Sequence, residues 1–180
     1  MKQLLEFFDF QPGEVVASLG ASGGFWEVGF GAAVPGLTFY LVERSPDLLN
    51  ESELAAAVTF WEKQTGRPVE SKFLPVIGTE TATCLPSHFF DKILIINSFH
   101  EFINPDAMLA ECQRILKPDG VLFLEEPLAK VPGELHGGCG RRLFTETELT
   151  DFLKQAGFSL RQSVSRDGTD FWTVFEYTFS

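Results

Sequence analysis

The stretch Glu14–Gly24, EVVASLGASGG, joins an apolar run to a glycine-rich turn. The run has the composition of a buried strand, and the glycines let the backbone turn tightly and approach a ligand where a Cβ would collide. Further along, Glu43 ends a second apolar run, Thr38–Val42. A carboxylate at the tip of a neighbouring strand can accept hydrogen bonds from both hydroxyls of a ribose. The pattern predicts a nucleoside-binding crevice, and a purely structural glycine turn is the alternative.

Strand-like and helix-like segments alternate along the rest of the chain. Continuous apolar runs such as 91–97 are typical of strands buried on both faces, which requires helices on both sides of a parallel sheet. Lys117–Gly120 is expected to be a turn, and Arg166–Thr169 indicates a hairpin that adds one antiparallel strand. The expected strands are 15–19, 38–42, 69–76, 91–97, 121–125, 160–164 and 171–179. The expected helices span Gly24–Ala33, Ser45–Gly66, Asn104–Lys117 and Thr145–Gly157. The fold class is therefore α/β, with a doubly wound, mostly parallel seven-stranded sheet.

Length and composition limit the organisation of the chain. With 180 residues, 44% of them hydrophobic, it is expected to form one domain, 1–180, whose residues 1–13 form an N-terminal arm. A formal net charge of −11 opposes binding to a phosphate backbone, so no nucleic-acid partner is expected. No segment has the length of a membrane span or the features of a signal peptide, so no membrane partner and a cytoplasmic location are expected.

The three cysteines indicate neither a disulfide framework nor a zinc knuckle. Cys84, Cys112 and Cys139 are odd in number and lack the Cys-x-x-Cys spacing, so they are expected to be reduced thiols. His136 lies near Cys139, but a third and a fourth ligand at suitable spacing are missing. No metal is therefore expected.

Three further blocks carry a family resemblance. They are FFDKILIINSFHEF (Phe89–Phe102), AMLAECQRILKPDGVLFLEEP (Ala107–Pro127) and FTETELTDFLKQAGF (Phe144–Phe158). With the elements in this order, the sequence from Glu14 to Phe179 resembles the class I S-adenosylmethionine-dependent methyltransferases, whose seven-stranded sheet carries a reversed last strand. The resemblance implies a Rossmann-like methyltransferase fold and S-adenosylmethionine as the cofactor.

The resemblance also implies a set of cofactor-binding residues. Three positions depart from the family pattern, and at two of them an acidic residue is replaced: Ser18 stands where the first strand usually ends in Asp or Glu, and Thr79 stands where many members place an Asp. Ser22 replaces the middle glycine of the turn, and Glu80 is the candidate substitute for the missing Asp. The implied residues are Ser18, Gly20, Ser22, Gly24, Glu43, Gly78, Thr79, Glu80 and Asn97.

The acceptor side of the site is less constrained by sequence. Methyl transfer depends mainly on aligning the nucleophile with the methyl group, and it needs a base only if the acceptor must lose a proton. His100, which follows a buried strand, is the candidate catalytic base, and a hydrogen bond within the turn is the alternative. Ser98, Glu101 and Arg141 are the candidate substrate-binding residues.

Two aromatic residues and one serine near the turn have competing interpretations. Phe25 and Trp26 could stack against a ligand or belong to the core. The letters GASGG match a hydrolase nucleophile elbow with Ser22 as the nucleophile, but no Asp followed by His ends the later strands.

The sequence thus predicts methyl transfer from S-adenosylmethionine to a small-molecule acceptor. The alternative is a catalytically silent methyltransferase-like binding module with weak or no cofactor affinity, motivated by Ser18, Ser22 and Thr79. A nicotinamide-dependent reductase is disfavoured by the closing hairpin and the Leu-Lys-Pro-Asp-Gly block. The acceptor and the oligomeric state stay open.

Overall fold

The structure is a computed structural model that describes residues 1–169 and 171–179. Its centre is a seven-stranded sheet with the order β3-β2-β1-β4-β5-β7-β6. Strand β7 pairs antiparallel with both β5 and β6, and the other neighbours pair in parallel. The predicted fold class is confirmed, including the one reversed strand. The strands are β1 (Val15–Leu19), β2 (Thr38–Glu43), β3 (Lys72–Ile77), β4 (Phe90–Ile96), β5 (Leu116–Pro127), β6 (Phe158–Ser165) and β7 (Trp172–Phe179).

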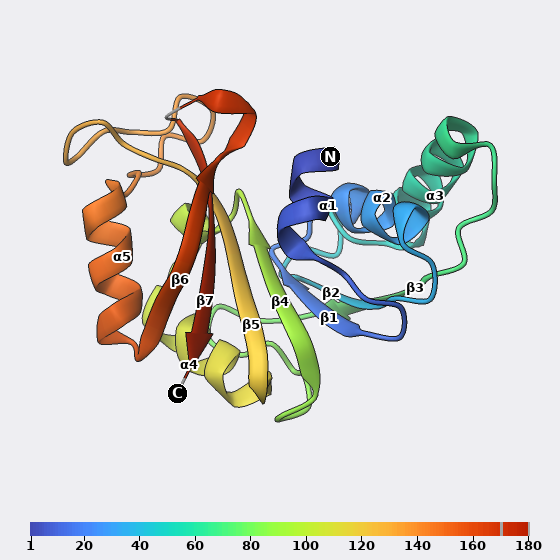
Figure 1. Ribbon diagram of the computed structural model, residues 1–180, viewed down its shortest axis with the longest axis horizontal. Helices are drawn as coiled ribbons and strands as arrows, with labels where there is room; N and C mark the ends of the chain where they lie inside the picture. The colour runs from blue at the N-terminus through green and yellow to red at the C-terminus, as the bar shows by residue number, and fades with distance from the viewer. Residues whose placement is uncertain (170, 180) are drawn as a thin grey trace.

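Helices cover both faces of this sheet (Figure 1). On one side lie α1 (Lys2–Phe8), α2 (Phe25–Ala33) and α3 (Glu51–Thr65), and on the other lie α4 (Pro105–Ile115) and α5 (Glu146–Gln155). Two short 3₁₀ turns, η1 (Phe99–Glu101) and η2 (Arg166–Gly168), complete the described elements. The predicted N-terminal arm contains α1, whose Phe8 is buried in the core. None of the described helices combines the length and the apolar character needed to cross a bilayer.

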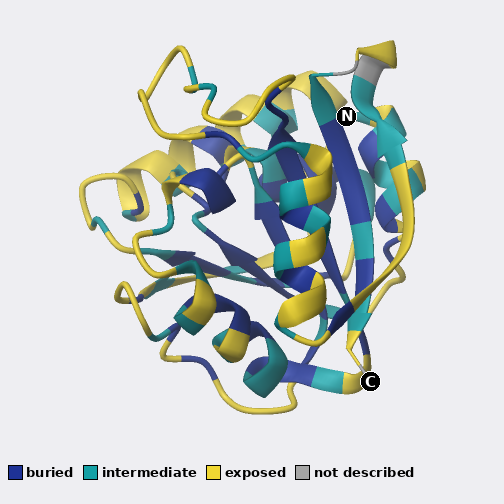
Figure 2. Ribbon diagram, turned by 90° about the vertical axis from the view of Figure 1, so that its left-hand side faces the viewer, coloured by how far each residue is buried: buried dark blue, intermediate teal, exposed yellow. Residues whose placement is uncertain are grey.

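Successive side chains of the central strands point to opposite faces of the sheet, and this divides the core into two layers. In β1, Val16 packs into the cluster beneath α1 and α2, whereas Ala17 packs into the cluster beneath α4 and α5. In β4, Leu94 and Ile95 divide in the same way. The period of two arises because successive side chains of a strand point to opposite faces. Figure 2 shows the result, with buried central strands and helices that expose their outer faces.

Two local expectations are wrong. The helix expected from Ser45 begins at Glu51 instead, because the Asn50 side chain accepts hydrogen bonds from Ser52 N and Glu53 N and caps it there. The expected turn at Lys117–Gly120 is part of β5. The register of the pairing between β4 and β5 shifts within this stretch, so residues 117–120 form an irregular part of the strand rather than a separate turn.

Helices α4 and α5 begin at their capping signals. Asn104 accepts a hydrogen bond from Ala107 N at the start of α4, where Pro105 occupies the first turn. Thr145 and Glu148 form the reciprocal capping box of α5. Both predictions are confirmed.

Candidate active site

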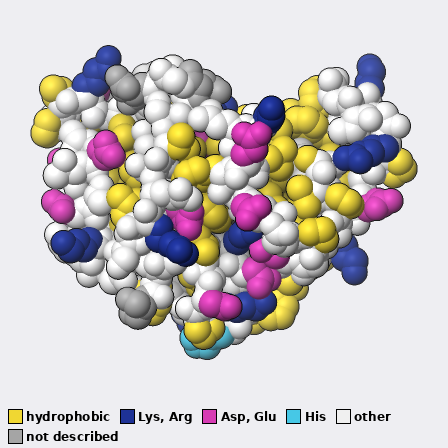
Figure 3. Space-filling model, in the orientation of Figure 1, with side chains coloured by type: hydrophobic (Ala, Val, Ile, Leu, Met, Phe, Trp, Pro, Cys, Tyr) yellow, Lys and Arg dark blue, Asp and Glu magenta, His cyan; other side chains and the backbone are white. Residues whose placement is uncertain are grey.

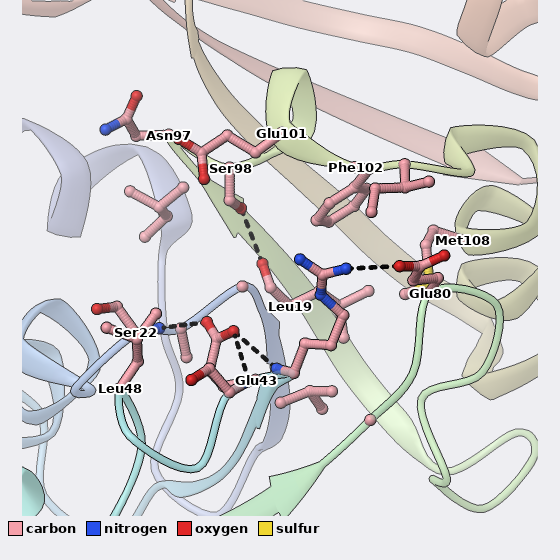
Figure 4. A pocket seen from close by; sticks show the side chains of 18 of the residues that line it. Leu19, Ser22, Glu43, Leu48, Glu80, Asn97, Ser98, Glu101, Phe102 and Met108 are labelled. Atoms are coloured by element: carbon pink, nitrogen blue, oxygen red, sulfur yellow. Dashed lines mark hydrogen bonds and ion pairs between the residues drawn. The ribbon is translucent and has the colours of Figure 1, made fainter. Parts of the chain in front are cut away.

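A cleft of about 590 Å³ opens at the carboxyl ends of β1, β2, β3 and β4. This is the edge where open α/β sheets bind ligands, since the loops after parallel strands gather there. Figure 4 shows part of its lining. Of the residues predicted for the site, those that line the cleft are Gly20, Ser22, Glu43, Gly78, Thr79, Glu80, Asn97, Ser98, Glu101 and Arg141. Ser18, Gly24 and His100 are not among the lining residues.

The glycine turn is held against the end of β2. Gly20 N and Ala21 N both donate hydrogen bonds to Val42 O, at 2.9 and 3.1 Å. Gly20 has a φ of +74°, and a Cβ built on it would lie 2.7 Å from both Cβ and Oγ of Ser98. Only glycine fits this position without moving the loop after β4. The turn is therefore fixed between the end of β2 and the loop after β4.

Glu43 lies at the centre of the cleft floor. Its carboxylate accepts hydrogen bonds from Ser22 N at 3.2 Å, from Arg44 N at 2.7 Å and from Ser45 N at 3.3 Å (Figure 4). These contacts join the end of β2 to the glycine turn of β1. The carboxylate thus lies beside the turn and is oriented by backbone donors.

A buried carboxyl group that the sequence reasoning missed lies next to this turn. Glu27, in the first turn of α2, lines the cleft although only 2% of the residue is exposed. Its Oε1 accepts a hydrogen bond of 2.5 Å from Ser18 Oγ, and its Oε2 has no hydrogen-bond partner among the described residues. Burial raises the pKa of Glu27 to about 7, against the lowering effect of the Ser18 hydrogen bond.

This pair explains the serine at the end of the first strand. Ser18 is itself 1% exposed and does not reach the cleft, so its hydroxyl serves the Glu27 carboxyl rather than a ligand. An acidic group is thus present beside position 18, brought there from α2. A possible signal was the acidic residue in the first turn of the helix after the glycine turn.

The loop after β3 forms one wall of the cleft. Glu80 forms an ion pair of 2.7 Å with Arg44, and both side chains are about half exposed. The Thr79 hydroxyl accepts hydrogen bonds from Thr81 N and Ala82 N, at 3.3 and 3.0 Å, and so shapes its own loop. Arg44 was not among the predicted residues.

The side of the cleft formed by the segments after β4 and β5 is polar and of mixed charge. Glu101 and Arg141 line it, together with Cys139 from the loop between β5 and α5. Ser98 is less available, because its Oγ donates a hydrogen bond of 2.9 Å to Leu19 O. Of the two aromatic candidates, Trp26 lines the cleft, whereas Phe25 packs against Phe60 and Trp61.

His100 lies behind the cleft wall. Its side chain is 0% exposed, and its Nδ1 lies 2.7 Å from Oε2 of the buried Glu126. Burial disfavours the charged ring, but the hydrogen bond and charge of Glu126 outweigh this and raise the pKa of His100. No histidine lines the cleft in the described part of the chain. The arrangement offers neither an accessible imidazole base nor the histidine of a serine hydrolase next to Ser22.

Charges on the surface are intermixed rather than segregated. Figure 3 shows acidic and basic side chains scattered over one face of the molecule, without a large basic area on that face. The basic side chains that line the cleft, Arg44 and Arg141, are accompanied there by four glutamates: Glu27, Glu43, Glu80 and Glu101. The cleft therefore suits a ligand that carries positive charge.

Solved structures with this fold are similar along nearly the whole chain. A SAM-dependent methyltransferase from Aquifex aeolicus is 19% identical with a TM-score of 0.72, covering 98% of this chain and 87% of its own. The 1,6-didemethyltoxoflavin-N1-methyltransferase of Burkholderia thailandensis, solved with 1,6-didemethyltoxoflavin and S-adenosylhomocysteine bound, is 22% identical with a TM-score of 0.71, covering 99% and 76%. The [4+2]-cyclase SpnF is 16% identical with a TM-score of 0.72, covering 99% and 79%.

Comparison with curated protein sequences finds no match. A protein-family model described as a methyltransferase domain matches residues 1–163, which is most of the chain and includes the whole glycine turn and cleft floor. The reversed seventh strand, the cleft at the sheet edge and this match agree with one another. The chain belongs to the methyltransferase domain family and has the fold of the class I S-adenosylmethionine-dependent methyltransferases.

Proposed function

We propose that the protein binds S-adenosylmethionine in the cleft and transfers its methyl group to a small-molecule acceptor. When bound, the cofactor supplies a methyl group on a sulfonium that a nucleophile of the acceptor displaces. The observation that carries the proposal is the Glu43 carboxylate, fixed by backbone donors beside a turn whose Gly20 admits no side chain. Each carboxylate oxygen has lone pairs beyond those used by the backbone, so Glu43 can still accept from ribose hydroxyls.

Glu27 is assigned to the charged amino group of the cofactor. Its Oε2 is buried, faces no hydrogen-bond partner among the described residues, and belongs to a side chain that lines the cleft next to the glycine turn. An ammonium group is the natural partner for such an oxygen, because a charge-assisted hydrogen bond offsets the cost of burying the carboxylate. Binding of the cofactor would therefore lower the pKa of Glu27 and keep it ionised.

The loop after β3 and the segment after β4 complete the proposed cofactor site. The backbone of Gly78–Glu80 would flank the adenine, and the Arg44–Glu80 ion pair would close this side. Asn97, held by a hydrogen bond of 2.8 Å from its N to Glu125 O, would face the methionine portion. Gly24 and Ser18 act from outside the cleft, by starting α2 and by orienting Glu27.

The acceptor is proposed to be a small polar molecule. A volume of about 590 Å³ lies within the roughly 300–1,000 Å³ of ordinary ligand pockets. The Burkholderia thailandensis neighbour was solved with a heterocyclic acceptor and the demethylated cofactor bound together. Glu101 and Arg141 would orient the acceptor here, and alignment rather than a histidine base would lower the barrier, since His100 lies behind the wall. We also propose that 1–180 acts as one domain in the cytoplasm.

Calorimetric titration with S-adenosylmethionine and S-adenosylhomocysteine tests the proposal. Both ligands should bind the wild-type chain, and Glu43→Gln should weaken binding by about ten- to a hundredfold, the value of a charge-assisted contact of roughly 1.5–3 kcal/mol. The exposed Glu70, which lies outside the cleft, provides the matched control Glu70→Gln. Unchanged affinity in Glu43→Gln, with circular dichroism like that of the wild type, would show that the ribose assignment is wrong.

A second candidate is a binding module that does not transfer methyl groups. It is favoured by the absence of a histidine from the described cleft lining and by the [4+2]-cyclase, whose fold is the same. Turnover distinguishes the two: methyl transfer from labelled cofactor to any member of an acceptor panel supports the first, whereas tight binding of both nucleosides without transfer supports the second.

A further inference from the structure

Three side chains of the kinds that bind transition metals meet beside the cleft. His100 lies in η1, directly after β4, whereas His136 and Cys139 lie in the loop between β5 and α5. Their ligand atoms all lie within 4.8 Å of one another, and His136 Nδ1 is 3.2 Å from Cys139 Sγ. The sequence separation of the two segments hides this cluster, because the pair His136 and Cys139 has no third partner nearby in the chain.

His100 is held as a metal ligand would be held. Its Nδ1 is fixed by Glu126, whose other oxygen accepts a hydrogen bond of 2.7 Å from Phe99 N. Its Nε2 is buried and has no hydrogen-bond partner in the described chain, and its ring lies 5.0 Å from that of His136. A buried nitrogen without a hydrogen-bond partner lowers the stability of the folded state unless a ligand binds it. A carboxylate that orients the opposite ring nitrogen is the usual outer partner of a metal-binding histidine.

The loop that carries the other two ligands has its own internal structure. His136 N donates to Arg141 O at 2.7 Å, and Gly140 N donates to His136 O at 2.8 Å. Leu135 and Arg142 form an antiparallel bridge at the base of this tight turn. The turn thus presents His136 and Cys139 together. A fourth donor is close, because Glu101 Oε1 lies 3.8 Å from His100 Nε2.

We propose that His100, His136, Cys139 and Glu101 form a zinc site in the wall of the cleft. Zn²⁺ takes mixed nitrogen, sulfur and oxygen ligands in a tetrahedral arrangement, and soft thiolate together with imidazole disfavours Mg²⁺ and Ca²⁺. Bonds of about 2.0–2.3 Å place tetrahedral ligand atoms roughly 3.3–3.6 Å apart. The exposed turn would move inward to close the site, and so would the side chain of Glu101, which is not in the group of three within 4.8 Å. The negative charges of Glu101 and a Cys139 thiolate would balance the two positive charges of the ion.

The position of this site connects it to the cleft. Glu101 and Cys139 both line the cleft, so the ion would lie at the surface that an acceptor molecule contacts. The inference does not depend on cofactor binding, because the ligands do not overlap with Glu43, Glu27 or the glycine turn. It does assign Glu101, proposed above to orient the acceptor, to the ion.

Metal titration of the chain without a polyhistidine tag tests the site. Zn²⁺ affinity is measured by competition with a chromogenic chelator, and Co²⁺ serves as a spectroscopic probe whose thiolate charge-transfer absorption reports the Cys139 ligand. The wild type should bind one ion per chain. Cys139→Ser should abolish the charge-transfer absorption, and Cys139→Ser and His136→Asn should each weaken Zn²⁺ binding by about tenfold or more.

The chain offers matched controls of both residue types. Cys84 is exposed and His88 contacts Leu116 O, and neither belongs to the cluster. Cys84→Ser and His88→Asn should therefore bind zinc like the wild type. The two test substitutions lie in an exposed turn, so these variants should fold even if His100→Asn does not. Adding Zn²⁺ should raise the melting temperature of the wild type but not that of Cys139→Ser. The proposal would be overturned if the wild type did not bind Zn²⁺, or if the test and control variants lost Zn²⁺ affinity equally.

Discussion

The carboxyl group of Glu27 occupies an environment that opposes its ionisation. The residue is 2% exposed, and its one described hydrogen bond comes from Ser18 Oγ. A buried charge without a full set of partners lowers the stability of the folded state. Such a group is retained at a functional site when a ligand completes it, which is the role proposed for the amino group of S-adenosylmethionine.

Glu27 makes a pH-dependent contribution to the stability of the folded state. The pKa of Glu27 rises from 4.5 in the unfolded chain to about 7 in the folded one. Between these values the folded state keeps a proton that the unfolded state has lost. The contribution of Glu27 to the free energy of unfolding is thus complete below about pH 4.5 and is lost as pH rises through about 7.

We expect Glu27→Gln to separate stability from binding. At pH 8 the variant should be more stable than the wild type by up to about 3 kcal/mol, because the cost of the buried charge is gone, and the difference should shrink towards pH 5. Urea unfolding at both pH values measures this. The same variant should bind S-adenosylmethionine at least about tenfold more weakly, as a lost charge-assisted contact implies. A variant that gains stability yet keeps full affinity would contradict the amino-group assignment.

At the scale of elements, the glycine turn and the loop after β4 define the mouth of the cleft together. Gly20 has a positive φ and contacts Ser98, whose hydroxyl in turn is bonded to Leu19 O. The close contact between Gly20 and Ser98 therefore fixes the end of β1 against the start of the loop after β4. Loosening this contact should move backbone atoms at the site rather than only destabilise the strand.

Gly20→Ala and Gly13→Ala should have different effects for that reason. Both glycines have a positive φ, but a Cβ at Gly13 meets nothing within 4 Å, whereas one at Gly20 would lie 2.7 Å from Ser98. Each variant should lose about 1–2 kcal/mol for the left-handed backbone. Only Gly20→Ala should lose more than this and also bind S-adenosylmethionine more weakly. Chemical unfolding and calorimetry measure the two effects, and equal affinities in the two variants would remove the turn from the site.

At the scale of the whole molecule, an excess of acidic side chains makes the protein repel negatively charged partners. The formal net charge is −11, and four of the charged residues that line the cleft are glutamates. Such a field attracts a cationic ligand such as a sulfonium and repels a polyanion. The two arginines of the lining are too few to reverse this.

We therefore expect no retention of duplex or single-stranded nucleic acid at a physiological ionic strength of about 0.15 M, where the Debye length is about 8 Å. A mobility-shift titration with DNA and RNA measures this, and a basic nucleic-acid-binding domain provides the positive control. Binding that weakens steeply with salt would show that a basic surface outside the cleft overrides the net charge.

Local patterns were sufficient to predict the elements and their order. The apolar runs of β1 and β4, the capping signals of α4 and α5 and the hairpin at the end depend on neighbours within a few residues, and all are confirmed. The misplaced start of α3 has the same origin, since Ser45 and Asn50 are both good caps and sequence alone does not rank them. Cleft residues at strand ends were also predictable, because parallel strands end at one edge.

The sequence by itself thus determined the α/β sheet with its reversed strand, the glycine turn and the position of Glu43. Only the tertiary structure decided that the Glu27 carboxyl lies against Ser18, and that His100 lies behind the wall rather than in the cleft. It alone also brought His100 to His136 and Cys139. The physical reason is that helical and strand periods fix which way a side chain points along its own element, whereas burial and contact between distant elements depend on how the sheet and its loops pack.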